Sequence, residues 1–173
     1  GRSASNYRAI RLADVILWRA EVAVHQDELN YARELVNRIR SRAADSINYV
    51  MGRCRTFELP KGVEPEVDYS KPAANYKCDT YDPGDFQDPE YALQAIKWEM
   101  RLEFAVHSGK RFYQLVRWGD AKEVLSEYIE KDQEFRGFLT GASFDEGDQY
   151  RPIPQNQIDL QGNDVLKQLE AYK

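Results

Sequence analysis

Apolar residues recur at helical spacing twice before residue 45, on either side of a short polar turn at His25-Gln26-Asp27. Each series advances by three and four residues in alternation, which places its members on one face of a helix. The first series is Ile10, Ala13, Leu17, Ala20 and Val24, and the second is Leu29, Ala32, Val36, Ile39 and Ala43. We predict one helix from Tyr7 to Val24 and a second with Asp27 as N-cap, which together form a tetratricopeptide-like hairpin over residues 6–44.

The hairpin needs further helices against which to bury its apolar faces, and residues 89–133 are predicted to supply them. Asp88 is a typical N-cap, and Pro89 suits the first position of the third helix. Its apolar stripe is predicted to be Tyr91, Ala95, Trp98, Leu102 and Ala105, with Gly109 in the left-handed position after its end. The fold class is therefore mainly α, with helices packed on the hairpin.

Two shorter helices are expected next, followed by an irregular tail over residues 134–173. The first carries the apolar residues Phe112, Leu115 and Val116, and Gly119 interrupts it. Asp120 and Glu123 have the spacing of a capping box for the next helix. In the tail, Pro152 and Pro154 predict an extended path.

Composition agrees with one domain that has a hydrophobic core. The net charge of −5 argues against a nucleic-acid partner, which would require a basic surface. No run of about 18 apolar residues is present to span a membrane, and no signal peptide opens the chain.

Glu99 and Glu103 lie one turn apart on the third predicted helix. Paired carboxylates could act as the acid and nucleophile of a glycosidase. Arg101, Arg111 and Arg117 are close in sequence, however, and can neutralise them. We favour an ion-pair network that joins the third and fourth helices, and we predict no catalytic residue.

No metal site or cofactor is predicted either. His25 and His107 have no second ligand at metal-binding spacing. The aspartates at 79, 82 and 85 could offer oxygens to calcium, but they lack the spacing of an EF-hand loop. Cys54 and Cys78 flank the irregular middle segment, and either a disulfide or two free thiols would fit that placement.

Three phrases of the sequence recur together in one known family. They are RLADVILWRAE from Arg11, EMRLEFAVHSGKRFYQLVRWGDA from Glu99, and YRPIPQNQIDL from Tyr150. The second resembles ERRxELAFEGxRFxDLVRWG and the third resembles LxPIPQxEIDLN, both of the SusD/RagB family. Departures include His107-Ser108-Gly109 in place of Glu-Gly, Gln114 in place of Asp, and LKQLEAYK from Leu166 in place of LxQNPGY.

The resemblance implies an outer-membrane nutrient-binding lipoprotein of Bacteroidetes, without enzymatic activity. Such a protein binds an oligosaccharide, or less often a peptide, at the cell surface and delivers it to a SusC-like TonB-dependent transporter. Family members are longer, so the resemblance implies that residues 1–173 are the C-terminal part, with the lipid anchor in preceding sequence. A helical-repeat module that binds a protein or peptide without binding sugar is the alternative.

The irregular segment over residues 46–88 is the candidate binding region, because long loops in compact domains are often functional. Sugar sites combine flat aromatic faces with planar amide and carboxylate groups, and this segment has both. A short strand is possible over residues 55–59. The alternative is that the aromatic residues only anchor the loop to the body. The candidate ligand-binding residues are Tyr69, Asn75, Tyr76, Asp79, Tyr81, Asp82 and Phe86.

Overall fold

The computed structural model describes residues 9–55, 63–107 and 109–172. Within these ranges it contains six α-helices and one two-stranded sheet, which confirms the mainly α fold. The chain forms two compact units, residues 1–105 and residues 106–173, which are described separately.

The first unit begins with the predicted helical hairpin, formed by α1 (Leu12–His25) and α2 (Leu29–Ala44). Most of both apolar series is buried, including Leu17 and Val36, which are fully enclosed. Ile10 lies before α1 and is exposed, and the predicted start at Tyr7 lies outside the described residues. The prediction of Asp27 as N-cap is wrong, because Asp27 adopts φ 61° in the turn and Glu28 occupies the cap.

Helix α3 (Pro89–Glu103) packs against both α1 and α2. Its predicted start is confirmed, since the Asp88 carboxylate accepts hydrogen bonds from the backbone N–H groups of Glu90 and Tyr91 at 3.1 and 3.4 Å. The predicted stripe is wrong except at Ala95, since Tyr91, Trp98, Leu102 and Ala105 are exposed. The buried face is instead Ala92, Ala95, Ile96, Glu99 and Met100.

Helix α3 also ends earlier than predicted. Phe104 is its C-cap, and Val106 takes the first left-handed conformation after it, at φ 61°. Gly109 is left-handed as predicted, at φ 66°, but it serves as the N-cap of the next helix rather than the end of α3.

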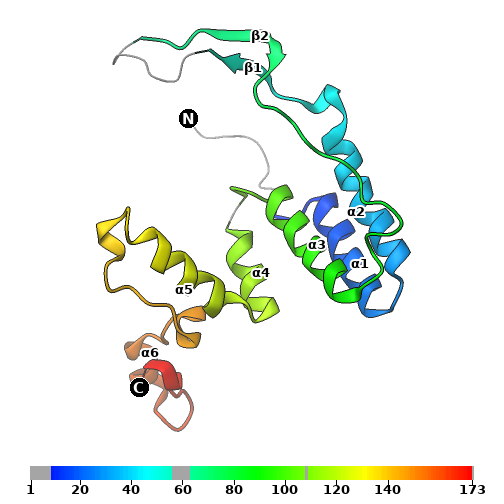
Figure 1. The fold of residues 1–173 in the computed structure, drawn as a ribbon. Helices are drawn as coiled ribbons and strands as arrows, with labels where there is room; N and C mark the ends of the chain where they lie inside the picture. Colours follow the sequence, from blue (N-terminus) through cyan, green and yellow to red (C-terminus); the bar gives the residue numbers. More distant parts are fainter. Residues whose placement is uncertain (1–8, 56–62, 108, 173) are drawn as a thin grey trace. The chain divides into compact units, whose positions relative to one another are not determined.

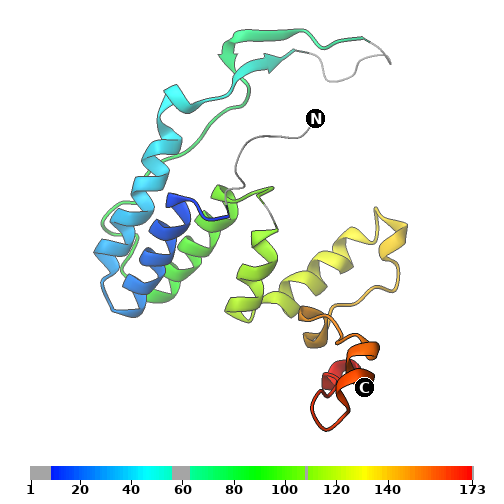
Figure 2. The same cartoon turned by 180° about the vertical axis from the view of Figure 1, so that it is seen from behind.

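An arm of two antiparallel strands, β1 (Met51–Cys54) and β2 (Val67–Pro72), lies within the segment predicted to be irregular. A short 3-10 turn, Ser46–Asn48, joins α2 to this arm. Figures 1 and 2 show the arm projecting beyond the end of α2, while the chain after β2 runs back alongside that helix. Of the strand suggested over residues 55–59, positions 56–59 lie outside the described residues.

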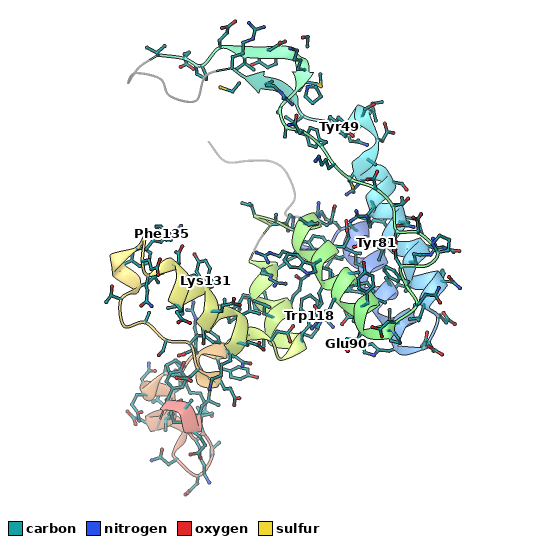
Figure 3. The ribbon with its side chains drawn as sticks, in the orientation of Figure 1. Tyr49, Tyr81, Glu90, Trp118, Lys131 and Phe135 are labelled. Atoms are coloured by element: carbon teal, nitrogen blue, oxygen red, sulfur yellow. The ribbon has the colours of Figure 1, made fainter. Side chains whose placement is uncertain are left out.

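The chain that runs back, residues 77–88, is here called the return segment, and side chains of α2 hold it. The Asn37 amide accepts a hydrogen bond from the Tyr81 N–H at 2.8 Å and donates one to the Tyr81 carbonyl at 2.9 Å. Nε of Arg40 donates to the Asp79 carbonyl, and the same guanidinium lies 4.6 Å from the centroid of the Tyr81 ring. Figure 3 shows Tyr81 lying against the helices.

Arg40 also forms an ion pair with a buried carboxylate of α3. Its Nη1 lies 2.9 Å from Oε2 of Glu99, whose side chain is only 7% exposed. Burial raises the pKa of Glu99, and the Arg40 hydrogen bond opposes that rise. For Arg40, burial alone would lower the pKa, but the hydrogen bond and charge of Glu99 raise it. One guanidinium therefore joins α2, α3 and the return segment.

The second unit contains α4 (Lys110–Trp118), α5 (Ala121–Asp132) and α6 (Gln155–Gln161), with three 3-10 turns. Gly119 ends α4 at φ 79°, as predicted, and Leu115 is buried. The predicted capping box is absent, because Asp120 makes no side-chain cap hydrogen bond.

Helix α6 lies in the tail that was expected to be irregular. The Gln168 amide pairs with both backbone groups of Ile153, at 3.0 and 2.9 Å.

We predict that Arg40→Ala lowers the free energy of unfolding by about 3–5 kcal/mol, because it leaves the buried Glu99 carboxylate without its partner. Chemical denaturation, followed by helical circular dichroism, measures the loss. The control is Arg38→Ala, an exposed arginine on the same helix, which should change stability by less than about 1 kcal/mol. Equal losses in the two variants would contradict this role for Arg40.

Candidate functional site

The seven predicted ligand-binding residues lie in three separate places. Tyr69 is on β2, Asn75 and Tyr76 follow that strand, and Asp79, Tyr81, Asp82 and Phe86 belong to the return segment. The structure therefore does not gather them into one site. The side chains in the three places differ in their exposure and in the residues that they contact.

The aromatic rings of the return segment pack onto the helical body. Phe86 is 1% exposed, and its ring meets Tyr81 edge-on at a centroid distance of 5.2 Å. Burial raises the pKa of the Tyr81 hydroxyl. The contacts of Tyr81 and Phe86 are therefore those expected of rings that anchor the loop to the helical body.

The backbone groups of two aspartates in the return segment form hydrogen bonds with side chains. The Asp79 carbonyl accepts the Arg40 hydrogen bond, and the Asp82 N–H donates to Oδ2 of Asp85 at 2.6 Å. Among the described residues, no group of three His, Cys, Asp or Glu side chains is placed to hold a metal ion. The hydrogen bonds at these aspartates therefore hold the return segment in its conformation.

A stacked pair of tyrosines lies where the arm meets α2. The rings of Tyr49 and Tyr76 are 4.3 Å apart at an interplanar angle of 20°. The Tyr76 hydroxyl accepts a hydrogen bond from the Val50 N–H at 3.1 Å, which fixes the far end of its ring. Tyr76 is still 38% exposed. Figure 3 shows Tyr49 at the point where the chain leaves α2.

Polar groups accompany this pair. Nη2 of Arg53 donates to Oδ1 of Asn75 at 2.8 Å, and Nε of Arg53 donates to the Pro72 carbonyl at 3.0 Å. Asn75 precedes Tyr76 in sequence and is exposed. We call Tyr49, Arg53, Asn75 and Tyr76 the arm base.

Sequence reasoning missed Tyr49 and Arg53 as members of this group. Tyr49 lies in the segment that was singled out, only one residue after the 3-10 turn, so its position could have drawn attention to it. Arg53 had no such signal, because its contact with Asn75 spans 22 residues of sequence.

The arm has one strongly polar face. Strand residues alternate between faces, so Asp68 and Ser70 lie on the face opposite to Val67 and Tyr69. Arg55 contacts Glu66 at 2.8 Å and Asp68 at 3.2 Å. The Ser70 hydroxyl donates to Asp68 at 2.6 Å and, with Arg55, lowers the pKa of Asp68 to about 2.

Tyr69 is the most exposed of the predicted aromatic residues, at 73%. It lies on the other face of β2, away from the Arg55–Asp68 ion pair. The ring therefore presents a large apolar surface to solvent, but it belongs to a different part of the arm from the arm base.

The two glutamates considered for catalysis are both paired with arginines, which come from α2 and from the N-cap of α1. Glu99 contacts Arg40, and Glu103 contacts Arg11 at 3.3 Å and Arg42 at 2.5 Å. None of these arginines was among the three predicted partners. Arg101 lies over the Trp98 ring, at 4.8 Å from its centroid. The ion-pair network thus joins α3 to the hairpin helices.

Cys54 and Cys78 do not form a disulfide. The Cys78 thiol donates to the Arg40 carbonyl at 3.5 Å, which adds one more contact between the return segment and α2. No helix in the described part of the chain is long and apolar enough to cross a membrane.

The described residues thus form a helical body that carries an arm with exposed aromatic rings, and the paired glutamates of α3 are engaged by arginines. The chain matches the model of the SusD family over residues 1–172, and it belongs to that family. The family is one of binding proteins associated with glycan binding and nutrient uptake, typically at the outer membrane. No curated protein matches the chain.

We predict that the Asp68 carboxyl titrates with a pKa of about 2, below its ordinary value of 3.8. Because this pKa is lowered on folding, the stabilisation is present above about pH 3.8 and is lost as the pH falls towards 2. Carboxyl carbon chemical shifts followed by NMR measure the midpoint.

Ser70→Ala removes the largest cause and should raise that midpoint, while the Arg55 contact remains. Ser126→Ala, in the second unit, is the matched control and should leave it in place. An Asp68 midpoint near 3.8 in the unmodified protein would show that the polar face of the arm does not form.

Proposed function

We propose that this protein binds an oligosaccharide through the arm base. The observation that carries the proposal is the stacked Tyr49–Tyr76 pair, which remains partly exposed beside the Arg53–Asn75 hydrogen bond. Two rings that served only to close the structure would be buried like Phe86. Membership of the SusD family supports a sugar as the ligand.

The arrangement suits the two surfaces of a sugar ring. The apolar C–H face can stack on the exposed face of Tyr76, whose ring is held in place by Tyr49 and by its hydroxyl contact with Val50. The Asn75 amide can donate to ring hydroxyls while its oxygen stays engaged with Arg53. Because these groups are already held, binding costs little further ordering of side chains.

At the level of the cell, we propose that the protein lies on the outer face of the outer membrane. There it would hold glycan for a SusC-like TonB-dependent transporter, which imports it. The support for this role is the family membership.

A second function, recognition of a peptide or protein helix, is favoured by a row of exposed apolar residues on α1. Val15, Trp18 and Val22 are spaced along one side of the helix and are 49%, 40% and 53% exposed. Such a row can pack against an amphipathic helix. Glycan binding without peptide binding would reject this alternative.

We predict that Tyr76→Ala weakens oligosaccharide binding by about 1–3 kcal/mol, or roughly five-fold to a hundred-fold, since stacking on one aromatic ring has that scale. A glycan array identifies the tightest oligosaccharide, and calorimetry measures its affinity. The control is Tyr128→Ala, which removes a tyrosine from α5 that is 50% exposed, against 38% for Tyr76.

Both variants should keep the unfolding midpoint of the parent protein within a few degrees. Equal affinity for Tyr76→Ala and the parent protein would reject the arm base as the sugar site. Failure of the parent protein to bind any glycan on the array would reject the proposed function itself.

A further inference from the structure

Strand β1 is interrupted by an irregularity at Gly52. Met51 pairs with Pro72 and Arg53 pairs with Asp68, so Gly52 alone faces residues 69–71 and forms a β-bulge whose extra residues lie on β2. Its φ of 116° is a conformation that side-chain-bearing residues rarely adopt. Bulges commonly redirect the side chains of a strand pair, so the bulge is expected to affect its neighbours on β2.

The space above Gly52 is filled by two side chains of β2. A β-carbon at this position would lie 3.2 Å from both Cδ1 and Cε1 of Tyr69 and 3.0 Å from Cγ1 of Val67. One side of the Tyr69 ring therefore rests where any other residue would place its β-carbon. The rest of the ring faces outward, since Tyr69 is 73% exposed.

We propose that Gly52 is a positioning residue, which seats the Tyr69 ring as a second stacking surface for the oligosaccharide; this inference rests on the proposed function. A solvent-exposed tyrosine whose ring packs against no neighbouring group samples several rotamers and loses that freedom when a ligand binds. The bulge removes much of this cost in advance, because the ring is held before the sugar arrives.

A single oligosaccharide can reach both stacking surfaces. The arm is only two strands wide, and neighbouring strands lie about 5 Å apart. We therefore expect a chain of several sugar rings to reach from Tyr69 to the arm base. The ligand class that fits is a neutral oligosaccharide of several pyranose rings, because Tyr69 faces away from the charges of Arg55 and Asp68.

The test is a double-mutant cycle with Gly52→Ala, Tyr69→Ala and the combined variant. Affinity for the tightest oligosaccharide of a neutral glycan array is measured by calorimetry on the whole protein. We expect Gly52→Ala to weaken binding about five-fold and Tyr69→Ala at least as much. In the Tyr69→Ala background, Gly52→Ala should have a smaller effect, since the part of its action that passes through the ring is gone, while the strain at φ 116° and the close approach to Val67 remain.

A spectroscopic readout separates positioning from a general loss of structure. NMR should show Overhauser contacts between the Tyr69 ring protons and the Gly52 α-protons in the parent protein and in Tyr69→Phe. In Gly52→Ala the ring should lose its fixed position, while the helical circular dichroism stays the same because β1 and β2 lie outside the packed helices.

The outcomes distinguish this inference from the function on which it rests. Equal losses from Gly52→Ala in both backgrounds, or absent ring contacts in the parent protein, would overturn the positioning role while glycan binding stands. Absence of glycan binding by the parent protein would reject the proposed function and this role together.

Discussion

The arrangement of α2, α3 and the return segment depends on one guanidinium group, that of Arg40. It pairs with the buried Glu99 carboxylate, donates to the Asp79 carbonyl and lies over the Tyr81 ring. A buried carboxylate is costly without a partner, so α2 and α3 must meet in the register that brings the two charges together. The same contact fixes the path by which the chain returns from the arm.

This constraint has a consequence for the candidate binding site. The arm begins at the end of α2 and returns along the side of α2, so both of its ends are fixed on one helix. Tyr49 and Tyr76 stack at the point where those two ends separate. The return segment, whose rings are packed on the helices, therefore holds the arm base in place while contributing little exposed aromatic surface of its own.

Local sequence patterns were enough to predict the helical hairpin and the Asp88 cap, because both depend on residues within a few positions of each other. The buried face of α3 could not be predicted in this way. Apolar residues occur on two sides of that helix, and the choice is made by the pairing of Glu99 with Arg40, 59 residues away. A stripe that included Tyr91 and Trp98 looked more apolar but is the exposed one.

The candidate site shows the same limit. Composition singled out residues 46–88 as the candidate binding region, since tyrosines are dense there, and that assignment stays a prediction. Which of these rings are buried and which are exposed could not be predicted from the sequence. Tyr81 is held by Asn37 and Arg40, which lie about forty residues earlier in the chain. The role of Arg53 beside Asn75 and the bulge at Gly52 both arise from strand pairing, which the sequence pattern did not indicate.

We propose that the sugar binds to the arm and that the return segment holds the arm in place. Amide hydrogen exchange with and without a saturating oligosaccharide tests that division most directly, because it reports on every segment at once. We predict that oligosaccharide slows amide exchange in residues 49–54 and 67–77 and leaves it unchanged in residues 78–88. Protection confined to residues 106–173, or to the return segment without the arm, would contradict it.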